Sequence, residues 1–306
     1  MDDPALSRRR LLELAGFGLG ASALTACTAG PVPPAPTSPT LPSPAPSGPD
    51  LPGPTAPPQL PGAPLQIRSS SGSFTSAFRP GIATHWSLAA PGRPPGGRAP
   101  QLPVAVFLHG LGGSHAVLLE ELAADEALLQ HLEAGGAPFA LAAVDGGRTW
   151  WHPRADGSDT QSMLVQEFVP FLGEQGYDLG RVGLFGLSMG GFGALLLASQ
   201  GRLPGVRAVA AMSPAVWDTY DERMDSAFDS REDFLAHDVF ALRPRLAALP
   251  KRIDCGAADD LAGTVRDYVA DLPDPVEGGF QPGGHDYGYW RSILPEVLSF
   301  LGRNLS

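Results

Sequence analysis

The feature that most constrains the fold of this chain is a series of short, unbroken apolar segments separated by stretches of helical character. Three of these segments follow residue 100, at 104–108, 139–144 and 182–187, and two further strand-like segments, 206–212 and 253–255, each contain one charged residue. An unbroken apolar run is typical of a strand that is covered on both faces, as in a parallel sheet. Regular alternation with helices predicts an α/β domain whose mostly parallel sheet carries helices on both faces. Ligands of such sheets bind beyond the carboxyl ends of the strands.

The remaining segments complete this pattern. We expect antiparallel strands at 65–68, 72–78 and 84–88, a last strand at 276–281, and helices at 116–134, 160–175, 189–200, 261–272 and 289–301. The stretch 215–249 mixes charged and aromatic residues, and Ser230-Arg231-Glu232-Asp233 within it resembles a helix capping box. Short helices are therefore expected there, and whether they close over a site is left open.

A nucleophile motif falls at one strand end. Gly186-Leu187-Ser188-Met189-Gly190 fits G-x-S-x-G, between the apolar run 182–187 and a helical stretch. This strand–turn–helix context is the one that a nucleophile elbow requires. The flanking glycines let the sharp turn avoid the neighbouring strand and helix. The sequence therefore predicts that Ser188 is a nucleophile.

A serine hydroxyl needs a base to take its proton, and His285 is the best placed of seven histidines. It lies in a Gly-rich loop after the last expected strand, which gives the chain order serine, acid, histidine. Five other histidines precede Ser188, and His237 lies in a helical stretch. The alternative is a loop histidine that faces solvent.

The imidazole in turn needs a carboxylate that fixes its tautomer. Asp259 and Asp260 follow the strand that ends at Cys255, and both are candidates. We prefer Asp259, which comes three residues after Gly256. The other aspartate is expected to cap the helix at 261–272.

An oxyanion formed during acyl transfer needs preorganised N–H donors. One is expected from the amide of Met189, directly after the nucleophile. The second is expected from the glycine-rich loop 108–113, where we choose the amide of Leu111. His109 in the same loop is interpreted as a residue that orients the loop.

Four tryptophans are candidate pocket residues. Trp150 and Trp151 follow the strand at 139–144, Trp217 follows the strand at 206–212, and Trp290 follows His285. They could wall a pocket for an acyl chain or a sugar, or they could pack a loop against the sheet edge, and both interpretations stay open. No metal-ligand spacing and no phosphate-cradling loop is evident, so no metal and no cofactor is expected.

The N-terminus has the pattern of an export signal. Adjacent arginines at 8–10 precede an apolar stretch, 11–26, that is shorter than the roughly 20 residues of a membrane span. It ends in Leu24-Thr25-Ala26-Cys27. Residues 1–27 resemble a twin-arginine signal with a bacterial lipobox, in which Cys27 is lipidated. An ordinary signal peptide is the alternative.

Composition divides the rest of the chain. Residues 28–64 are rich in Pro, Ser, Thr, Ala and Gly, a composition that cannot bury a core and is typical of a disordered linker. This leaves 65–306 as the catalytic domain, held at the outer face of the membrane by Cys27. The other cysteine, Cys255, is expected to be a small buried residue. A net charge of -11 disfavours a nucleic-acid partner. No oligomeric state follows from the sequence.

Three strings, Phe107–Gly113, Leu184–Leu195 and Gly283–Trp290, resemble the putative-esterase family of α/β hydrolases. That family includes S-formylglutathione hydrolases, feruloyl and enterochelin esterases, and bacterial mycolyltransferases. The resemblance covers about residue 65 to the C-terminus and implies an α/β-hydrolase fold, a Ser188–Asp259–His285 triad, and amides of Leu111 and Met189 at the oxyanion.

The resemblance implies a serine esterase that acts on a small ester or an envelope glycolipid. A first alternative is an acyltransferase that moves an acyl group to a sugar or lipid alcohol. No clear equivalent of the acceptor-sugar sites of mycolyltransferases is evident. A second alternative is a surface lipoprotein that binds without catalysis.

Overall fold

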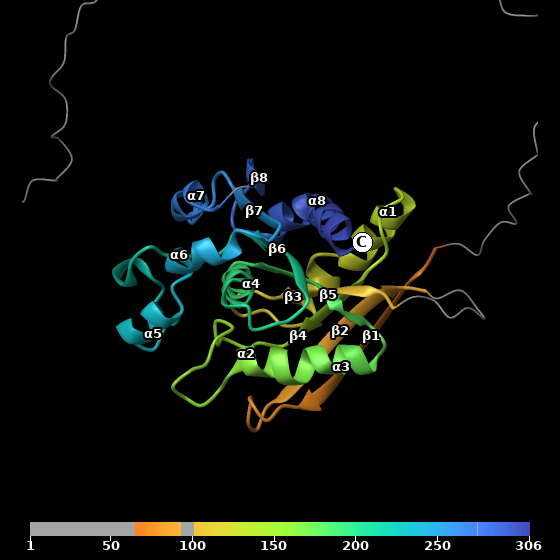
Figure 1. Ribbon diagram of the computed structural model, residues 1–306, viewed down its shortest axis with the longest axis horizontal. Helices are drawn as coiled ribbons and strands as arrows, with labels where there is room; N and C mark the ends of the chain where they lie inside the picture. The colour runs from red at the N-terminus through yellow and green to blue at the C-terminus, as the bar shows by residue number, and fades with distance from the viewer. Residues whose placement is uncertain (1–64, 93–100, 274) are drawn as a thin grey trace, which may run out of the picture. The chain divides into compact units, whose positions relative to one another are not determined.

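The computed structural model describes residues 65–92, 101–273 and 275–306. The expected signal peptide, lipidated Cys27 and linker therefore lie outside the described residues. The described chain forms an eight-stranded sheet in the order β1-β2-β4-β3-β5-β6-β7-β8 (Figure 1). The strands are β1 (Ile67–Thr75), β2 (Ala83–Pro91), β3 (Pro103–Leu108), β4 (Ala140–Val144), β5 (Asp178–Leu187), β6 (Val206–Met212), β7 (Lys251–Gly256) and β8 (Val276–Gln281).

Among the eight described strands, β2 alone runs opposite to the others. β1 pairs with β2 and β2 with β4 in antiparallel fashion, whereas every pair from β4 through β8 is parallel. The predicted α/β-hydrolase architecture is thus confirmed. The expectation of separate strands at 65–68 and 72–78 is wrong, because the serine-rich segment between them stays extended and pairs with β2 throughout.

The helices lie between the parallel strands, as the alternation predicts. The α-helices are α1 (Ala124–Glu133), α2 (Thr160–Met163), α3 (Val169–Glu174), α4 (Met189–Gln200), α5 (Arg231–Ala236), α6 (Val239–Leu242), α7 (Ala262–Ala270) and α8 (Tyr287–Leu305). π-helical turns occupy Val117–Glu121 and Leu164–Phe168, and 3-10 turns occupy Tyr220–Glu222 and Arg243–Leu246. The single helix expected at 116–134 is therefore divided. Ala123 interrupts it with a left-handed conformation, φ 49°.

Two apolar cores cover the two faces of the sheet. Alternate side chains of β3 point to opposite faces, as the period of two of a strand requires. Val104 and Val106 join the core that contains α2, α3 and α4, and Ala105 and Phe107 join the core that contains α1 and α8. Figure 1 shows α1 and α8 together on one side of the sheet. The core on both faces explains why β3 and β4 are apolar throughout.

Helix α4 is enclosed on almost every side. Ten of its twelve residues are buried, including glycines as well as Phe192 and Leu195. Its sequence is apolar around the whole circumference, which is typical of a helix without a solvent face. The helix begins at Met189, so Ser188, the residue directly before it, is anchored to a helix that is buried in the core.

Segment 215–249 forms short helices, as expected. The Ser230 hydroxyl caps α5 by accepting a hydrogen bond from the Asp233 amide at 3.1 Å, and Asp238 caps α6. Phe228 and Phe234 are buried in the same core as α4.

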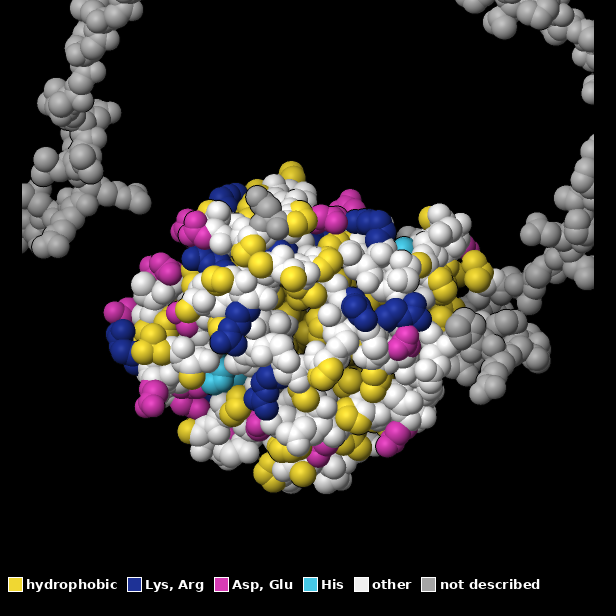
Figure 2. Space-filling model, viewed as in Figure 1, with side chains coloured by type: hydrophobic (Ala, Val, Ile, Leu, Met, Phe, Trp, Pro, Cys, Tyr) yellow, Lys and Arg dark blue, Asp and Glu magenta, His cyan; other side chains and the backbone are white. Residues whose placement is uncertain are grey.

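Acidic and basic side chains are interspersed over the face that Figure 2 shows, without a continuous basic patch. Within residues 65–92, 101–273 and 275–306, no helix combines the length and apolar character needed to cross a bilayer.

Candidate active site

Ser188 occupies a strained turn between β5 and α4. Its backbone has φ 53° and ψ −118°, a conformation that side-chain-bearing residues rarely adopt and that is typical of functional sites. A Cβ on Gly190 would overlap the carbonyl of Leu108, and one on Gly186 would overlap the carbonyl of Gly190. The two glycines are thus required because the turn brings β3, β5 and α4 into backbone contact.

The structure brings Ser188, His285 and Asp259 together in one hydrogen-bonded chain. The Ser188 Oγ lies 2.9 Å from His285 Nε2, and His285 Nδ1 lies 2.8 Å from Asp259 Oδ2. Because a carboxylate can only accept, it places the ring proton on Nδ1. Nε2 therefore presents a lone pair to the serine hydroxyl, which donates to it. This is the arrangement in which an imidazole acts as a general base.

Asp259 performs two tasks with its two oxygens. Oδ2 accepts from His285, while Oδ1 accepts the Leu261 amide at 2.8 Å and closes the turn before α7. The side chain of Asp259 is fully buried, whereas Asp260 is exposed. The expectation that the second aspartate caps the helix is therefore wrong: α7 begins without a side-chain cap, because the Asp259 carboxylate already holds the turn.

The loop that carries His285 is fixed on both sides. The Ala258 amide donates to the Gly283 carbonyl at 2.9 Å, which joins the acid loop to the histidine loop. Asp286 caps α8 by accepting the Tyr289 amide at 3.0 Å. These contacts hold the imidazole in reach of both its partners before any substrate binds.

Trp290 supports the imidazole from the side. Its ring meets the His285 ring edge-to-face at a centroid distance of 4.9 Å, and its Nε1 donates to Ser213 Oγ at 3.0 Å. Ser213 follows β6 with φ 46°. Sequence reasoning missed Ser213, for which only its position directly after a strand was a signal.

The expected oxyanion loop lies against the nucleophile. A Cβ on Gly110 would stand 3.4 Å from the Cβ of Ser188, so the backbone that precedes Leu111 passes directly beside the serine. Met189 is the first residue of α4, and its amide belongs to the helix N-terminus, where N–H groups lack partners within the helix. The two segments that carry the predicted donors thus lie next to Ser188.

His109 fixes the oxyanion loop through a defined tautomer. Its Nε2 accepts the Gly146 amide at 2.8 Å, so its proton is on Nδ1, which donates to the Gly110 carbonyl at 2.8 Å. Burial lowers the pKa of His109, which keeps the ring neutral. Trp151 Nε1 also donates to the His109 carbonyl at 3.2 Å. His109 thus fastens the oxyanion loop to the loop that follows β4, which is the physical basis of its expected orienting role.

All four candidate tryptophans are buried, with 8% or less of their surface exposed. Trp151 packs against the position of Gly193 on α4, and Trp150 meets the rings of Phe192 and Trp217. These side chains are therefore packed inside the fold, as the packed-loop interpretation predicts, and they do not form the wall of an open pocket. Loop packing and an open pocket produce the same residue pattern in a sequence, because both need large apolar groups after a strand.

An open cavity of about 450 Å³ lies beside the loop that follows β4, and among the described residues its lining includes neither a triad residue nor a residue of the oxyanion loop 108–113. Its lining includes three arginines, Arg79, Arg148 and Arg154, together with Asp156 and Asp229. Arg148 is the lining residue that comes near the oxyanion loop, because a Cβ on Gly112 would lie 3.9 Å from its Nη1.

The three arginines of the cavity differ in their partners. Arg154 pairs with Asp229 at 2.7 Å, and Arg79 donates to the hydroxyl of Thr84 and the carbonyl of Asp145. Arg148 has no carboxylate within ion-pair distance among the described residues.

Cys255 is free and fully buried in β7. Burial, with a smaller contribution from Asp259, raises the pKa of its thiol to about 12. A thiol is a nucleophile only as the thiolate. The residue therefore packs as a small apolar side chain and takes no part in the site.

Comparison with known proteins defines the class of the chain. Residues 93–301 match the family described as "Putative esterase", and the chain belongs to this family of α/β hydrolases. No curated protein sequence matches it.

Solved structures share the fold. A ferulic acid esterase superposes with a TM-score of 0.66 at 20% identity, over 78% of this chain and 98% of that one. An S-formylglutathione hydrolase from Staphylococcus aureus gives 0.62 at 18% identity, over 77% and 99%. MPT51 from Mycobacterium tuberculosis gives 0.64 at 12% identity, over 78% and 99%.

Proposed function

We propose that this protein is a serine esterase that cleaves carboxylic esters through an acyl-enzyme on Ser188. The observation that carries the proposal is the continuous hydrogen-bonded chain from the Ser188 hydroxyl through His285 to the buried Asp259 carboxylate. Membership of an esterase family supports the same reaction class. A complete triad of this kind argues against a purely binding role, because binding needs neither the strained serine nor the buried acid.

The proposed reaction has two halves. Ser188 Oγ attacks the ester carbonyl carbon while His285 Nε2 takes the hydroxyl proton, and the oxyanion accepts hydrogen bonds from the Met189 and Leu111 amides. The intermediate collapses, the C–O bond breaks, and the alcohol leaves with the proton from His285. A water molecule, deprotonated by His285, then attacks the acyl carbonyl and releases the acid and free Ser188.

The arginine-lined cavity suggests the class of substrate. The arginines of its lining, above all Arg148 without a carboxylate partner among the described residues, favour an anionic group on the acyl or alcohol part of the ester over a long alkyl chain. A panel of aryl esters graded by acyl length, with acidic acyl groups included, tests this. Preference for short or acidic acyl groups is expected, and Arg148→Gln should raise KM for the acidic esters selectively. A preference for long alkyl chains contradicts it.

A fluorophosphonate probe tests the nucleophile. The folded protein should be labelled once, on the peptide that contains Ser188, and Ser188→Ala should remain unlabelled while keeping the circular dichroism of the wild type. Labelling of a different residue, or no labelling of folded protein, contradicts the proposal.

Acyl transfer to a sugar or lipid alcohol is the second candidate, because the charged and hydroxyl side chains in the cavity lining suit an acceptor with several hydroxyls. Product analysis in buffer with and without a candidate sugar separates the two. Free acid in both samples supports hydrolysis, and acylated sugar that forms faster than free acid supports transfer.

We further propose that the protein is exported and anchored to the outer face of the membrane through Cys27, on the basis of the signal pattern of residues 1–27. Metabolic labelling with radioactive palmitate tests this. Incorporation should occur in the wild type and be lost in Cys27→Ser, and equal labelling of both, or of neither, contradicts the anchor.

A further inference from the structure

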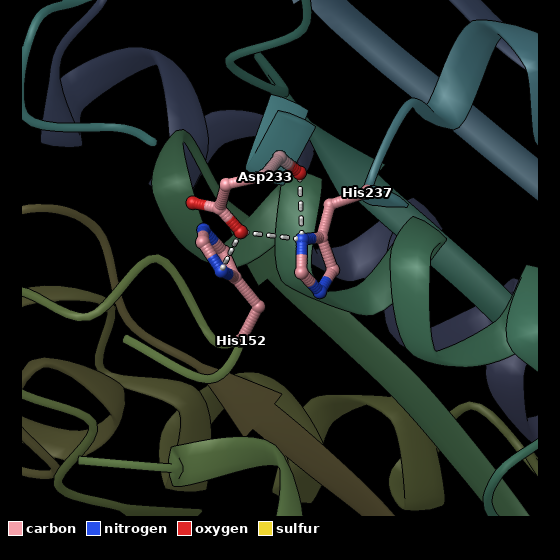
Figure 3. Close-up of side chains that lie close together, drawn as sticks. All are labelled: His152, Asp233 and His237. Carbon is pink, nitrogen blue, oxygen red and sulfur yellow. Dashed lines mark hydrogen bonds and ion pairs between the residues drawn. The ribbon is translucent and has the colours of Figure 1, made fainter. Parts of the chain in front are cut away.

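A second group of histidine and aspartate side chains converges away from the triad. His152 lies in the loop after β4, and Asp233 and His237 lie one turn apart on the same face of the α5 region (Figure 3). One ligand atom from each residue falls within 4.8 Å of the others. Asp233 Oδ1 is 2.9 Å from His237 Nδ1 and 3.7 Å from His152 Nδ1, so a single carboxylate oxygen faces both rings.

The buried His152 ring has oxygen atoms at both nitrogens. Nε2 is 2.9 Å from the Ala227 carbonyl and Nδ1 is 2.9 Å from the Pro153 carbonyl. A neutral imidazole carries a single N–H, so it can donate to only one of these two carbonyl oxygens and keeps one nitrogen lone pair for another group.

We propose that His152, Asp233 and His237 form a binding site for a divalent transition metal ion, with Zn²⁺ as the best match. Imidazole nitrogen and carboxylate oxygen are the ligands that Zn²⁺ prefers in proteins. Tetrahedral bonds of about 2.0–2.2 Å place neighbouring ligand atoms roughly 3.3–3.5 Å apart. The observed separations of 2.9 and 3.7 Å lie on either side of that value, so small side-chain shifts complete the site.

The surrounding contacts suit metal ligands. With the proton of His152 on Nε2, the ring donates to the Ala227 carbonyl, and Nδ1 is free to bind the metal; such an outer hydrogen bond orients metal-bound histidines generally. Asp233 Oδ2 accepts the Asp229 amide at 2.8 Å, which leaves Oδ1 for the ion. His237 Nδ1 also lies 2.9 Å from the backbone carbonyl of Asp233, so metal binding at Nδ1 requires the ring proton to sit on Nε2. Three protein ligands leave a fourth position for water.

The ion would join two segments of chain. His152 follows the buried Trp150 and Trp151, whose loop fixes the oxyanion loop through His109. Asp233 lies on α5 and His237 directly follows it, both in the segment 215–249. The bound metal would therefore tie this segment to the loop after β4.

Zinc titration by calorimetry tests the site on the full chain, purified without a polyhistidine tag and treated with a chelator. One Zn²⁺ per chain is expected, and Co²⁺ should give the intense visible absorption of tetrahedral coordination. His237→Gln and, separately, Asp233→Asn should weaken binding by ~100-fold or more, since even outer-shell changes cost 10–100-fold. His85→Gln is the matched control, because His85 forms an exposed pair with Asp145 and should leave binding unchanged.

Three outcomes overturn the proposal: no zinc binding by folded wild-type protein, equal binding by the wild type and both cluster variants, or loss of binding in His85→Gln. Nitrogen NMR that shows His152 protonated on both nitrogens at neutral pH also overturns it, since a proton then fills the position of the metal. The result is independent of the esterase proposal, because fluorophosphonate labelling of Ser188 in the metal-free protein is measured separately.

Discussion

Two histidines of this molecule, His285 and His152, each face an aspartate, yet their surroundings give them opposite properties. His285 is partly exposed and has a carboxylate at Nδ1 and a hydroxyl at Nε2, so each nitrogen has a complementary partner. His152 is fully buried and has a carbonyl oxygen at each nitrogen. The first ring can take up and release a proton during a reaction, whereas the second is suited to hold a cation.

The comparison shows that the partner of the second nitrogen decides what a His–Asp pair does. In the triad that partner is an O–H group, which can donate and can be activated. In the cluster it is a carbonyl, which can only accept a hydrogen bond and cannot be activated as a nucleophile. A short His–Asp distance by itself identifies neither a catalytic base nor a metal ligand.

Replacing each histidine should give the largest contrast. His285→Ala should lower kcat by about 10⁴–10⁶-fold, as loss of a base from a triad does, with little change in Tm. His152→Ala should instead lower the free energy of unfolding by ~1–3 kcal/mol, through lost buried contacts, and keep most of the activity per folded molecule. Ester hydrolysis and thermal denaturation measure the two effects. Similar losses of activity in both variants contradict the division of roles.

The next largest effect should be the difference in kcat between variants of the two neighbouring aspartates. Asp259→Asn presents an amide to His285 and favours the wrong tautomer, so kcat should fall by about 10⁴-fold. Asp260→Asn should change kcat by less than about 2-fold, because substitutions at exposed positions away from special features have small effects. Steady-state kinetics on one aryl ester suffices. A large loss in the second variant would reverse the assignment of the triad acid.

Removing the support of His285 should have a smaller effect. Trp290→Phe keeps an aromatic ring beside the imidazole but leaves Ser213 Oγ without its donor, at a cost of ~1–2 kcal/mol in stability. We expect kcat to fall a few-fold while KM stays constant, since the ring positions the base and touches no substrate. A change in KM alone would indicate a place in the substrate pocket instead.

The smallest expected effect concerns Cys255. With the pKa of its thiol raised to about 12, only about one thiol in 10⁴ is ionised at pH 8, so iodoacetamide should leave both the folded protein and its activity unchanged. Labelling should appear only in denaturant, as mass spectrometry of the Cys255 peptide can show. Rapid alkylation of the native protein contradicts the burial of this side chain.

Local pattern predicted the sheet, the parallel core and the elbow, because apolar runs and the G-x-S-x-G spacing are contiguous in sequence. β6 and β8 match the predicted ranges, 206–212 and 276–281. The sharing of Asp259 between His285 and the Leu261 amide could not be predicted, since it depends on how one carboxylate is oriented. The buried packing of Trp150 depends likewise on α4, and the grouping of His152 with Asp233 depends on how a distant segment folds back.

The burial of α4 has a consequence for how this family can diversify. A nucleophile whose helix has no solvent face cannot move without repacking the centre of the protein, so the reacting atoms stay in register while the surface changes. The segments that line the cavity, by contrast, are loops with exposed residues, where insertions and exchanges cost little. New specificities should therefore arise by altering the loops around an invariant reaction centre.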